Sequence, residues 1–200
     1  MMPGKKTMRA FLLIVTALAL AGCVPNNVRQ GDAAVFDFGE GEGGWNAPSP
    51  RGVDVVAPVW LGSAAMQYRL AYSEPARRRA YADSRWAAAP AELLEQELRR
   101  RALAGGAAAI ACRLRVDIDE FVQVFASEQS SRIVLAVRAT LLSRNEQVVA
   151  SRAIKLERSA VSADARGGVA AAAAAVQGLA GELGGWIAQE KSALATRCKE

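Results

Sequence analysis

The chain has 200 residues, with 25 Lys and Arg, 20 Asp and Glu, and no histidine, which gives a formal charge of +5. Three of the basic residues lie in the first 22 positions, so the rest of the chain holds 22 basic against 20 acidic side chains. This near balance argues against a nucleic-acid partner bound through bulk charge. The lack of histidine removes the commonest general base and metal ligand, so we expect no catalytic residue, no metal site and no cofactor.

The first 23 residues have the pattern of a bacterial lipoprotein signal. Three basic residues precede the apolar run 10–20, as in a secretory signal peptide. Leu20 and two small residues then lie directly before Cys23, which resembles the lipoprotein box. In that family the cysteine is diacylated, the chain is cut before it, and the new amine is acylated. Residues 1–22 are therefore predicted to be a signal peptide, with Cys23 as the lipidated first residue, carrying palmitate or similar chains.

Two other interpretations of this segment are a secretory signal with an incidental cysteine and an uncleaved membrane anchor. The apolar run of about 11 residues is well short of the roughly 20 that a spanning helix needs, which disfavours the anchor. Val24 follows the cysteine, whereas Asp at that place tends to retain enteric lipoproteins at the inner membrane. The sequence thus predicts a lipid anchor in the outer membrane facing the periplasm, a tether up to residue 32, and a single domain over 33–195.

The segment 33–72 predicts three strands. The first covers 33–38 and is followed by a glycine-rich loop over 39–44. Strands over 53–56 and 66–72 flank a stiff turn at 58–62. The last of them places alternate side chains on one face, namely Met66, Tyr68, Leu70 and Tyr72.

A helix is predicted from Pro90 to about Ala104, and Gly105-Gly106 ends it. Its glutamates precede its arginines, which matches the helix dipole and places oppositely charged residues four apart. The triplet 99–101 is interpreted as a solvated helix end rather than a partner patch. The predicted buried stripe is Ala91, Leu94, Leu98 and Ala102.

The segment 109–156 is rich in strand patterns, with a hairpin turn at Asn145-Glu146. The predicted strands are 114–118, 121–125, 132–142 and 148–156.

A long helix is predicted over about 165–194. Its narrow apolar stripe favours a helix laid on a sheet over a helix–helix docking face. Gly178, Gly181 and Gly185 weaken the helix by about 1 kcal/mol each relative to Ala. They are therefore expected to permit close approach of another group. The stripe consists of Val169, Ala172, Val176, Leu179, Leu183 and Trp186.

Two cysteines remain once Cys23 is assigned to lipid. Cys112 and Cys198 could pair in an oxidising periplasm. The alternative is two unpaired thiols, with Cys112 buried as a small apolar side chain. The sequence leaves both interpretations open.

Four residues are candidates for contact with a partner. Trp45 and Trp60 lie in predicted loops, and Trp is over-represented in binding hot spots. Asp119 and Phe121 belong to an acidic and aromatic segment that would form a docking edge, with a solvated strand edge as the alternative. Core packing is the expectation for the other two tryptophans, Trp86 and Trp186.

Several segments together resemble the ABC-type transport auxiliary lipoproteins, a family that includes the lipoprotein of the paraquat-inducible operon. The resemblance covers most of 33–190. It implies a three-layer α/β domain with a mixed sheet, built here from about five to six strands and two main helices. It also implies a periplasmic protein of the mammalian-cell-entry (MCE) type as the partner. The resemblance is carried by Tyr68-Arg69-Leu70, Tyr81, Ser84-Arg85-Trp86, Pro90, Leu114-Arg115-Val116, Phe121-Val122-Gln123-Val124-Phe125 and Trp186.

The leading function is therefore a non-catalytic outer-membrane lipoprotein that docks the periplasmic component of an ABC/MCE-type lipid transport system and supports membrane integrity. A ring-forming homo-oligomer is a further expectation. The alternative function is a lipoprotein that binds peptidoglycan or an envelope assembly, because a fold alone excludes few binding roles. A hydrolase is disfavoured, since no Gly-x-Ser-x-Gly motif is present and no histidine could activate a serine.

Overall fold

The computed structural model describes residues 33–41, 45, 47–105 and 109–198. These belong to one compact unit, Ala33–Glu200. Cys23, the predicted signal peptide and the tether lie outside the described residues, as do positions 42–44 of the glycine-rich loop. The strands are β1 (Ala34–Phe36), β2 (Ser49–Pro50), β3 (Val53–Val56), β4 (Ala65–Leu70), β5 (Glu74–Trp86), β6 (Ala109–Ile110), β7 (Arg113–Ser127), β8 (Ser130–Leu142) and β9 (Val148–Ser159). The helices are η2 (Val59–Leu61), α2 (Pro90–Ala104), α3 (Ala165–Gln189) and α4 (Lys191–Arg197).

The main sheet has seven strands in the order β1-β5-β4-β7-β8-β9, and β3 pairs with part of β7. β7, β8 and β9 form an antiparallel meander, while β3 and β4 run parallel to β7. The sheet is therefore mixed, and with two main helices the fold is of the predicted mixed α/β class. A two-stranded pairing of β2 with β6 lies apart from it and was not predicted.

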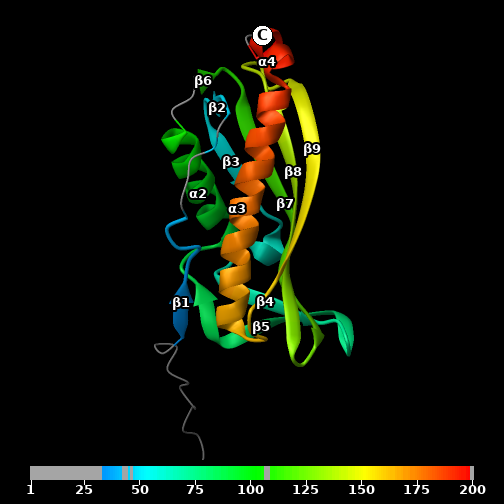
Figure 1. The fold of residues 1–200 in the computed structure, drawn as a ribbon. Helices are drawn as coiled ribbons and strands as arrows, with labels where there is room; N and C mark the ends of the chain where they lie inside the picture. Colours follow the sequence, from blue (N-terminus) through cyan, green and yellow to red (C-terminus); the bar gives the residue numbers. More distant parts are fainter. Residues whose placement is uncertain (1–32, 42–44, 46, 106–108, 199–200) are drawn as a thin grey trace, which may run out of the picture. The chain divides into compact units, whose positions relative to one another are not determined.

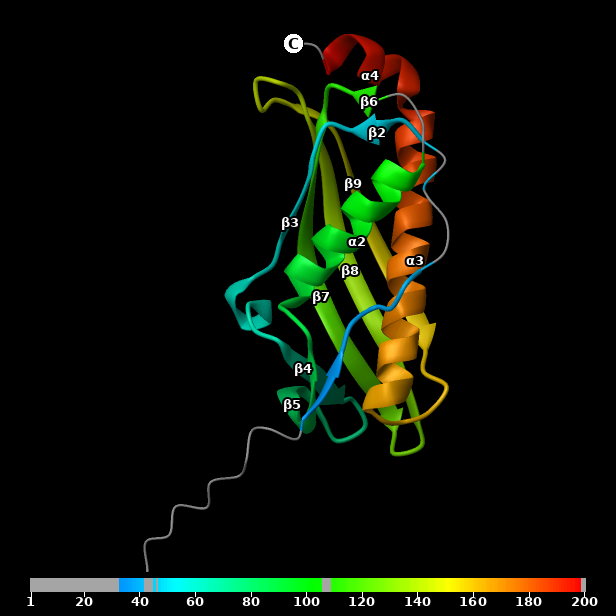
Figure 2. The same ribbon diagram turned by 90° about the vertical axis from the view of Figure 1, so that its left-hand side faces the viewer.

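Both main helices cover the same face of the sheet (Figures 1 and 2). α2 packs mainly on β3, and α3 packs on β8 and β9. One apolar cluster joins Leu94 of α2, Val176 of α3 and Leu135 of β8. The described residues therefore form one helix layer on one sheet layer, and not the three layers that the resemblance implied. α3 laid on the sheet agrees with the preferred interpretation of its stripe.

The face of the sheet that no helix covers is called the open face below. Because successive side chains along a strand point to opposite faces, the residues that belong to the open face can be assigned. On β8, Ile133, Leu135 and Val137 point to the helices and are buried, while Arg132 and Arg138 belong to the opposite face. The registers extend this face across β7 and β9, where it carries further charged side chains, namely Arg115, Asp117, Glu120, Lys155 and Glu157.

The predicted strands differ from the structure in two places. β5 was not predicted, because Pro75 and the run Arg77–Arg79 are poor strand signals. Segments 114–118 and 121–125 are one strand, β7, with a register shift between Ile118 and Glu120. The extra residue of this bulge breaks the alternation that a sequence pattern relies on.

The last helix is also shorter than expected. α3 ends at Gln189, and the separate helix α4 begins at Lys191. At the end of α4, Cys198 is joined to Cys112 in a disulfide, with a sequence separation of 86 residues. Both cysteines are buried, so of the two interpretations left open the structure has the pairing.

The glycines of α3 do not behave as expected. A Cβ at Gly181 or Gly185 would meet nothing within 4 Å, so only Gly178 of the three lies against another group, the guanidinium of Arg158. The tightest approaches in α3 are instead at Gly167 and Gly168, where a Cβ would lie 2.1 Å from the carbonyl oxygen of Ser162 and 2.1 Å from Oε1 of Gln123, respectively. Gly184 is a further close contact, since a Cβ there would lie 3.3 Å from Cβ of Trp45.

Candidate protein-docking site

Of the four predicted contact residues, Trp60 is the aromatic residue whose side chain is broadly exposed. Its side chain is 54% exposed on the short helix η2, beside Val59 at 95%. Val56, the last residue of β3, adds a third exposed apolar side chain. We call Val56, Val59 and Trp60 the Trp60 patch. Single exposed apolar residues are ordinary, but three within five positions of the chain, one of them a tryptophan, are typical of interaction surfaces.

The chain leaves the sheet at this point for a geometric reason. β3 pairs with β7 as far as Val56 opposite Asp117, and β4 resumes that side of β7 at Tyr68 opposite Gln123. The stretch of β7 between them contains the bulge, so no regular partner strand fits there. Pro58, at a φ of −65°, then begins the turn that raises η2 away from the sheet.

Trp60 is held in place by polar contacts on both its ring and its backbone. The guanidinium carbon of Arg78 lies 5.8 Å from the ring centroid, within the range of a cation–π contact. The carbonyl of Trp60 accepts a hydrogen bond from Nε2 of Gln67. Arg78 in turn donates to Oε1 of Gln67 at 3.1 Å, so ring and backbone are tied to one network.

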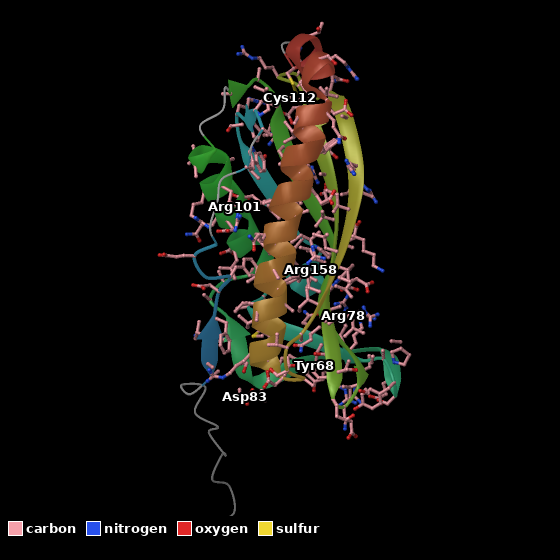
Figure 3. The ribbon with its side chains drawn as sticks, viewed as in Figure 1. Tyr68, Arg78, Asp83, Arg101, Cys112 and Arg158 are labelled. Atoms are coloured by element: carbon pink, nitrogen blue, oxygen red, sulfur yellow. A yellow bond between two sulfur atoms is a disulfide. The ribbon has the colours of Figure 1, made fainter. Side chains whose placement is uncertain are left out.

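Glu120 anchors this network to the bulged strand. Its Oε1 accepts from Arg78 at 2.7 Å and its Oε2 accepts from Arg69 at 3.1 Å. All three side chains are about one-quarter exposed. Two guanidinium groups facing one carboxylate leave an excess positive charge beside Trp60. Figure 3 shows where Arg78 lies, in the part of the unit where β4 and β5 join the sheet.

Trp45 and Phe121 were expected to contact a partner, and this expectation is wrong. Trp45 is only 2% exposed, because it packs against α3 at Gly184. Phe121 is 5% exposed, with its ring centroid 5.6 Å from that of Trp86 and 6.0 Å from that of Phe38. Neither side chain can reach a partner while the core is closed.

Asp119 does lie at the surface. It belongs to the bulge of β7, and its carboxylate is 4.0 Å from the guanidinium of Arg138. Asp119 directly precedes Glu120, the residue that holds Arg78. Asp119 and the Trp60 patch are therefore both located at this bulge, although they are far apart in the sequence. Sequence reasoning missed Arg78 and Gln67, and it placed Glu120 in the acidic docking edge without its role in holding Arg78. Only the strand register could have connected these residues.

The residues that carry the family resemblance are largely structural. Gln123 is 2% exposed and donates from Nε2 to Oγ of Ser131 and to the carbonyl of Asp164, at the start of α3. Its Oε1 accepts from the hydroxyl of Tyr81 at 3.0 Å. Burial raises the pKa of Tyr81, which keeps that hydroxyl a donor. The Phe-x-Gln-x-Phe strand therefore fixes the beginning of α3 rather than presenting a site.

A second polar cluster lies on α2, where the arginine triplet was expected to be solvated. Glu97 and Arg101 are buried, with Oε1 and Nε 2.6 Å apart. Arg100 is more exposed, reaches Glu97 at 2.8 Å and donates to the carbonyl of Gly41 at 2.8 Å. The expectation is thus wrong for Arg101, whose side chain is buried, while Arg100 ties α2 to the segment after β1.

A cleft of about 410 Å³ lies beside this cluster. Its lining includes Phe38, Gly41 and Arg101, together with small residues of α3. Across the described ranges, no group of three or more Cys, Asp or Glu side chains is arranged to hold a metal ion. In the same part of the chain, no helix has both the length and the apolar character needed to cross a membrane.

Comparison with known proteins supports the fold. No family model and no curated protein matches the sequence. A crystal structure of a DUF330-family protein from Xanthomonas campestris is 24% identical, with a TM-score of 0.68 over 80% of this chain and 99% of that one. Another crystal structure, described as an uncharacterized protein, is 15% identical, with a TM-score of 0.58 over 80% of this chain and 98% of that one.

A third crystal structure, from Caulobacter crescentus CB15 and described as a candidate lipoprotein, has a TM-score of 0.35 and is 20% identical over 49% of this chain and 83% of that one. That overlap is too small to support an argument. At these identities the first two structures show that the fold is shared, and no more.

Proposed function

We propose that this chain is a non-catalytic lipoprotein of the outer membrane, and that its domain docks the periplasmic MCE-type protein of an ABC-type lipid transport system. The lipoprotein box at Cys23 supports the anchor. The disulfide between Cys112 and Cys198 is consistent with an oxidising compartment. The observation that carries the docking role is the Trp60 patch on its Arg78–Glu120 support.

The patch suits a protein partner for two physical reasons. Burying Trp60 and Val59 removes exposed apolar surface from water, at about 25 cal/mol per Å². The contacts of Arg78 and Gln67 hold the tryptophan before the partner arrives, so little side-chain ordering remains to be done on binding. The excess positive charge favours a partner surface that is acidic around an apolar centre.

A photo-crosslinking experiment in living cells tests this role. A photoreactive phenylalanine analogue is placed at Trp60 in the full chain, expressed with its own signal sequence. The matched control carries it at Tyr72, an aromatic residue with similar exposure of 47% that lies outside the Arg78 network. We expect position 60, and not position 72, to capture an MCE-type periplasmic protein, which mass spectrometry would identify.

Loss-of-function variants sharpen the same test. Trp60→Ala should abolish co-purification of that partner and reproduce the membrane-stress sensitivity of a deletion strain, whereas Tyr72→Ala should do neither. If position 60 captured only peptidoglycan fragments or an unrelated assembly protein, the transport role would be wrong. Sedimentation with purified sacculi would then support the envelope-binding alternative.

A further inference from the structure

β9 forms one end of the main sheet, and its outer side is unpaired among the described residues. Within the part of the chain that the structure describes, its 12 residues pair only with β8 (Figure 1). At the opposite end of the sheet, β1 has only 3 residues. A long free edge is a template for pairing with another strand, and proteins commonly blunt such edges. The long outer edge of β9 therefore needs a structural explanation, whereas the short edge at β1 does not.

The hydrogen bonds of the β8–β9 ladder identify which backbone groups face outward. The N–H of Ala160 donates to the carbonyl of Ser131 at 2.9 Å, which marks a hydrogen-bonded pair one step beyond β9. Such pairs alternate along an antiparallel ladder. Leu156 and Ile154 consequently bond to β8, whereas the backbone groups of Ala153, Lys155, Glu157 and Ser159 point away from it.

The charges on β9 match a second copy of β9 in one register. Lys155 and Glu157 lie on the open face, with side chains 64% and 41% exposed. Within one chain, Nζ of Lys155 lies 2.9 Å from Oε1 of Glu157, and Glu157 also pairs with Arg132 at 2.8 Å, so a second copy would extend these ion pairs into an alternating network. In an antiparallel pair with a two-fold axis through Leu156, each Lys155 lies opposite Glu157 of the second copy, and their outward backbone groups pair as well. Axes through Lys155 or Glu157 would oppose like charges, and an axis through Ile154 would pair neither residue with a charge.

The helix layer leaves room for this approach. On the flank of α3 that lies above β9, Gly178 lies against Arg158, and the carboxylate of Glu182 lies 3.7 Å from the guanidinium of Arg152. Gly185 follows on the same flank, seven residues after Gly178, and a Cβ there would meet nothing within 4 Å. Arg158 fills the space beside Gly178, so Gly185 is the position on this flank at which the structure leaves open space.

We propose that β9 is a self-pairing edge at which two copies of this chain join antiparallel, on a two-fold axis through Leu156, to form one continuous sheet. A second copy fits better than a free peptide, because it brings a preformed strand of equal length with the complementary charges already in place. The contact is isologous, so it closes at two copies and does not by itself build the ring-forming homo-oligomer expected from the sequence. This inference does not rest on the proposed function.

Charge reversal tests the register. The full lipidated chain is extracted from membranes in detergent, and its mass is followed by sedimentation over a range of protein concentrations. The wild type should form a dimer. Lys155→Glu and Glu157→Lys should each raise the dissociation constant about tenfold or more, since two attractive pairs become repulsive. The double variant Lys155→Glu/Glu157→Lys should restore most of the lost affinity between the two copies. The control Arg144→Glu reverses a charge in the β8–β9 turn and should change nothing.

Disulfide trapping tests the same geometry in the membrane. Side chains directly opposite in antiparallel strands have Cβ atoms about 4.5–5.5 Å apart, slightly beyond the roughly 3.5–4.5 Å of a disulfide, so a small shift of the strands would bring two opposed cysteines into bonding distance. Cells that co-express a Lys155→Cys copy and a Glu157→Cys copy with different tags should form the mixed crosslink. Cells with the Lys155→Cys copy alone should form little. A monomer at all concentrations, unaltered mass after charge reversal, or stronger trapping of Lys155→Cys with itself would each overturn the proposal.

Discussion

Removal of the disulfide between Cys112 and Cys198 is expected to lower the free energy of unfolding substantially. The bond closes a loop of 86 residues. In the chain-entropy model, a loop of that length restricts the unfolded chain by about 4.6 kcal/mol at 25 °C. Whole domains are stabilised by only about 5–15 kcal/mol, so the bond would supply a large share of the total.

Part of this loss should appear as local detachment of α4. A helix of seven residues is too short to persist in water by itself. α4 is held by the disulfide, by buried Leu194, and by Arg197, which donates to the carbonyl of Val148 at 3.2 Å. Without the covalent link, α4 should open at a lower cost than the rest of the unit, and the measured global effect would then be smaller than the entropic figure.

Chemical denaturation of the oxidised and reduced protein measures the effect, with the double variant Cys112→Ala/Cys198→Ala as control. The oxidised wild type should unfold at the highest denaturant concentration, and reductant should leave the double variant unchanged. Limited proteolysis should cut the reduced chain first near α4. Titration of two free thiols in the native protein, or identical midpoints with and without reductant, would refute this reasoning.

Two further predictions concern α3. Gly168→Ala should lower the free energy of unfolding by about 1–3 kcal/mol, because its Cβ would overlap buried Gln123, which three hydrogen bonds hold in place. The matched change Gly181→Ala should be neutral or raise it by up to about 1 kcal/mol, and equilibrium denaturation measures both. Asp164 caps α3, and the hydrogen bond from the backbone N–H of Gly167 holds the pKa of its carboxyl below the usual value. Its contribution to stability is therefore complete above about pH 4 and is lost as the pH falls through the native pKa. Asp164→Asn keeps a cap that does not titrate, so its stability should fall less steeply on acidification, as denaturation at a series of pH values would reveal.

Contrary results would be informative. Equal stability of Gly168→Ala and Gly181→Ala would mean that Gln123 can move aside in spite of its hydrogen bonds. Parallel acid-denaturation curves for Asp164→Asn and the wild type would mean that other carboxylates control stability at low pH. Glu74 and Glu157 are the groups to vary next, because hydrogen bonds from Arg79 and Lys155, respectively, also lower the pKa of their carboxyls.

Much of the local structure could be predicted from the sequence. The helix Pro90–Ala104 has the predicted bounds, because a proline at its start and a glycine after its end act locally. β8 lies where a strand over 132–142 was predicted, because alternation along a strand is a local signal. β5 could not be found in this way, because its arginines suit a strand only where carboxylates such as Glu120, contributed by another strand, lie within reach.

The candidate docking site was predictable only in part. Trp45 and Trp60 have the same local signal, a tryptophan in a loop with prolines and glycines nearby. Gly184 of α3 leaves the space that buries Trp45, whereas the bulge of β7 raises η2 and exposes Trp60. Burial depends on what lies opposite a side chain in space, and the sequence around each tryptophan does not contain that information.

The sequence by itself determined the signal pattern ending at Cys23, the periodicity of the strands and the ends of α2, because each depends on residues close together in the chain. The tertiary structure alone decided the pairing of Cys112 with Cys198, the placement of both helices on one face, and the free edge at β9. Each of these depends on contacts between residues far apart in sequence, whose geometry is set when the sheet assembles.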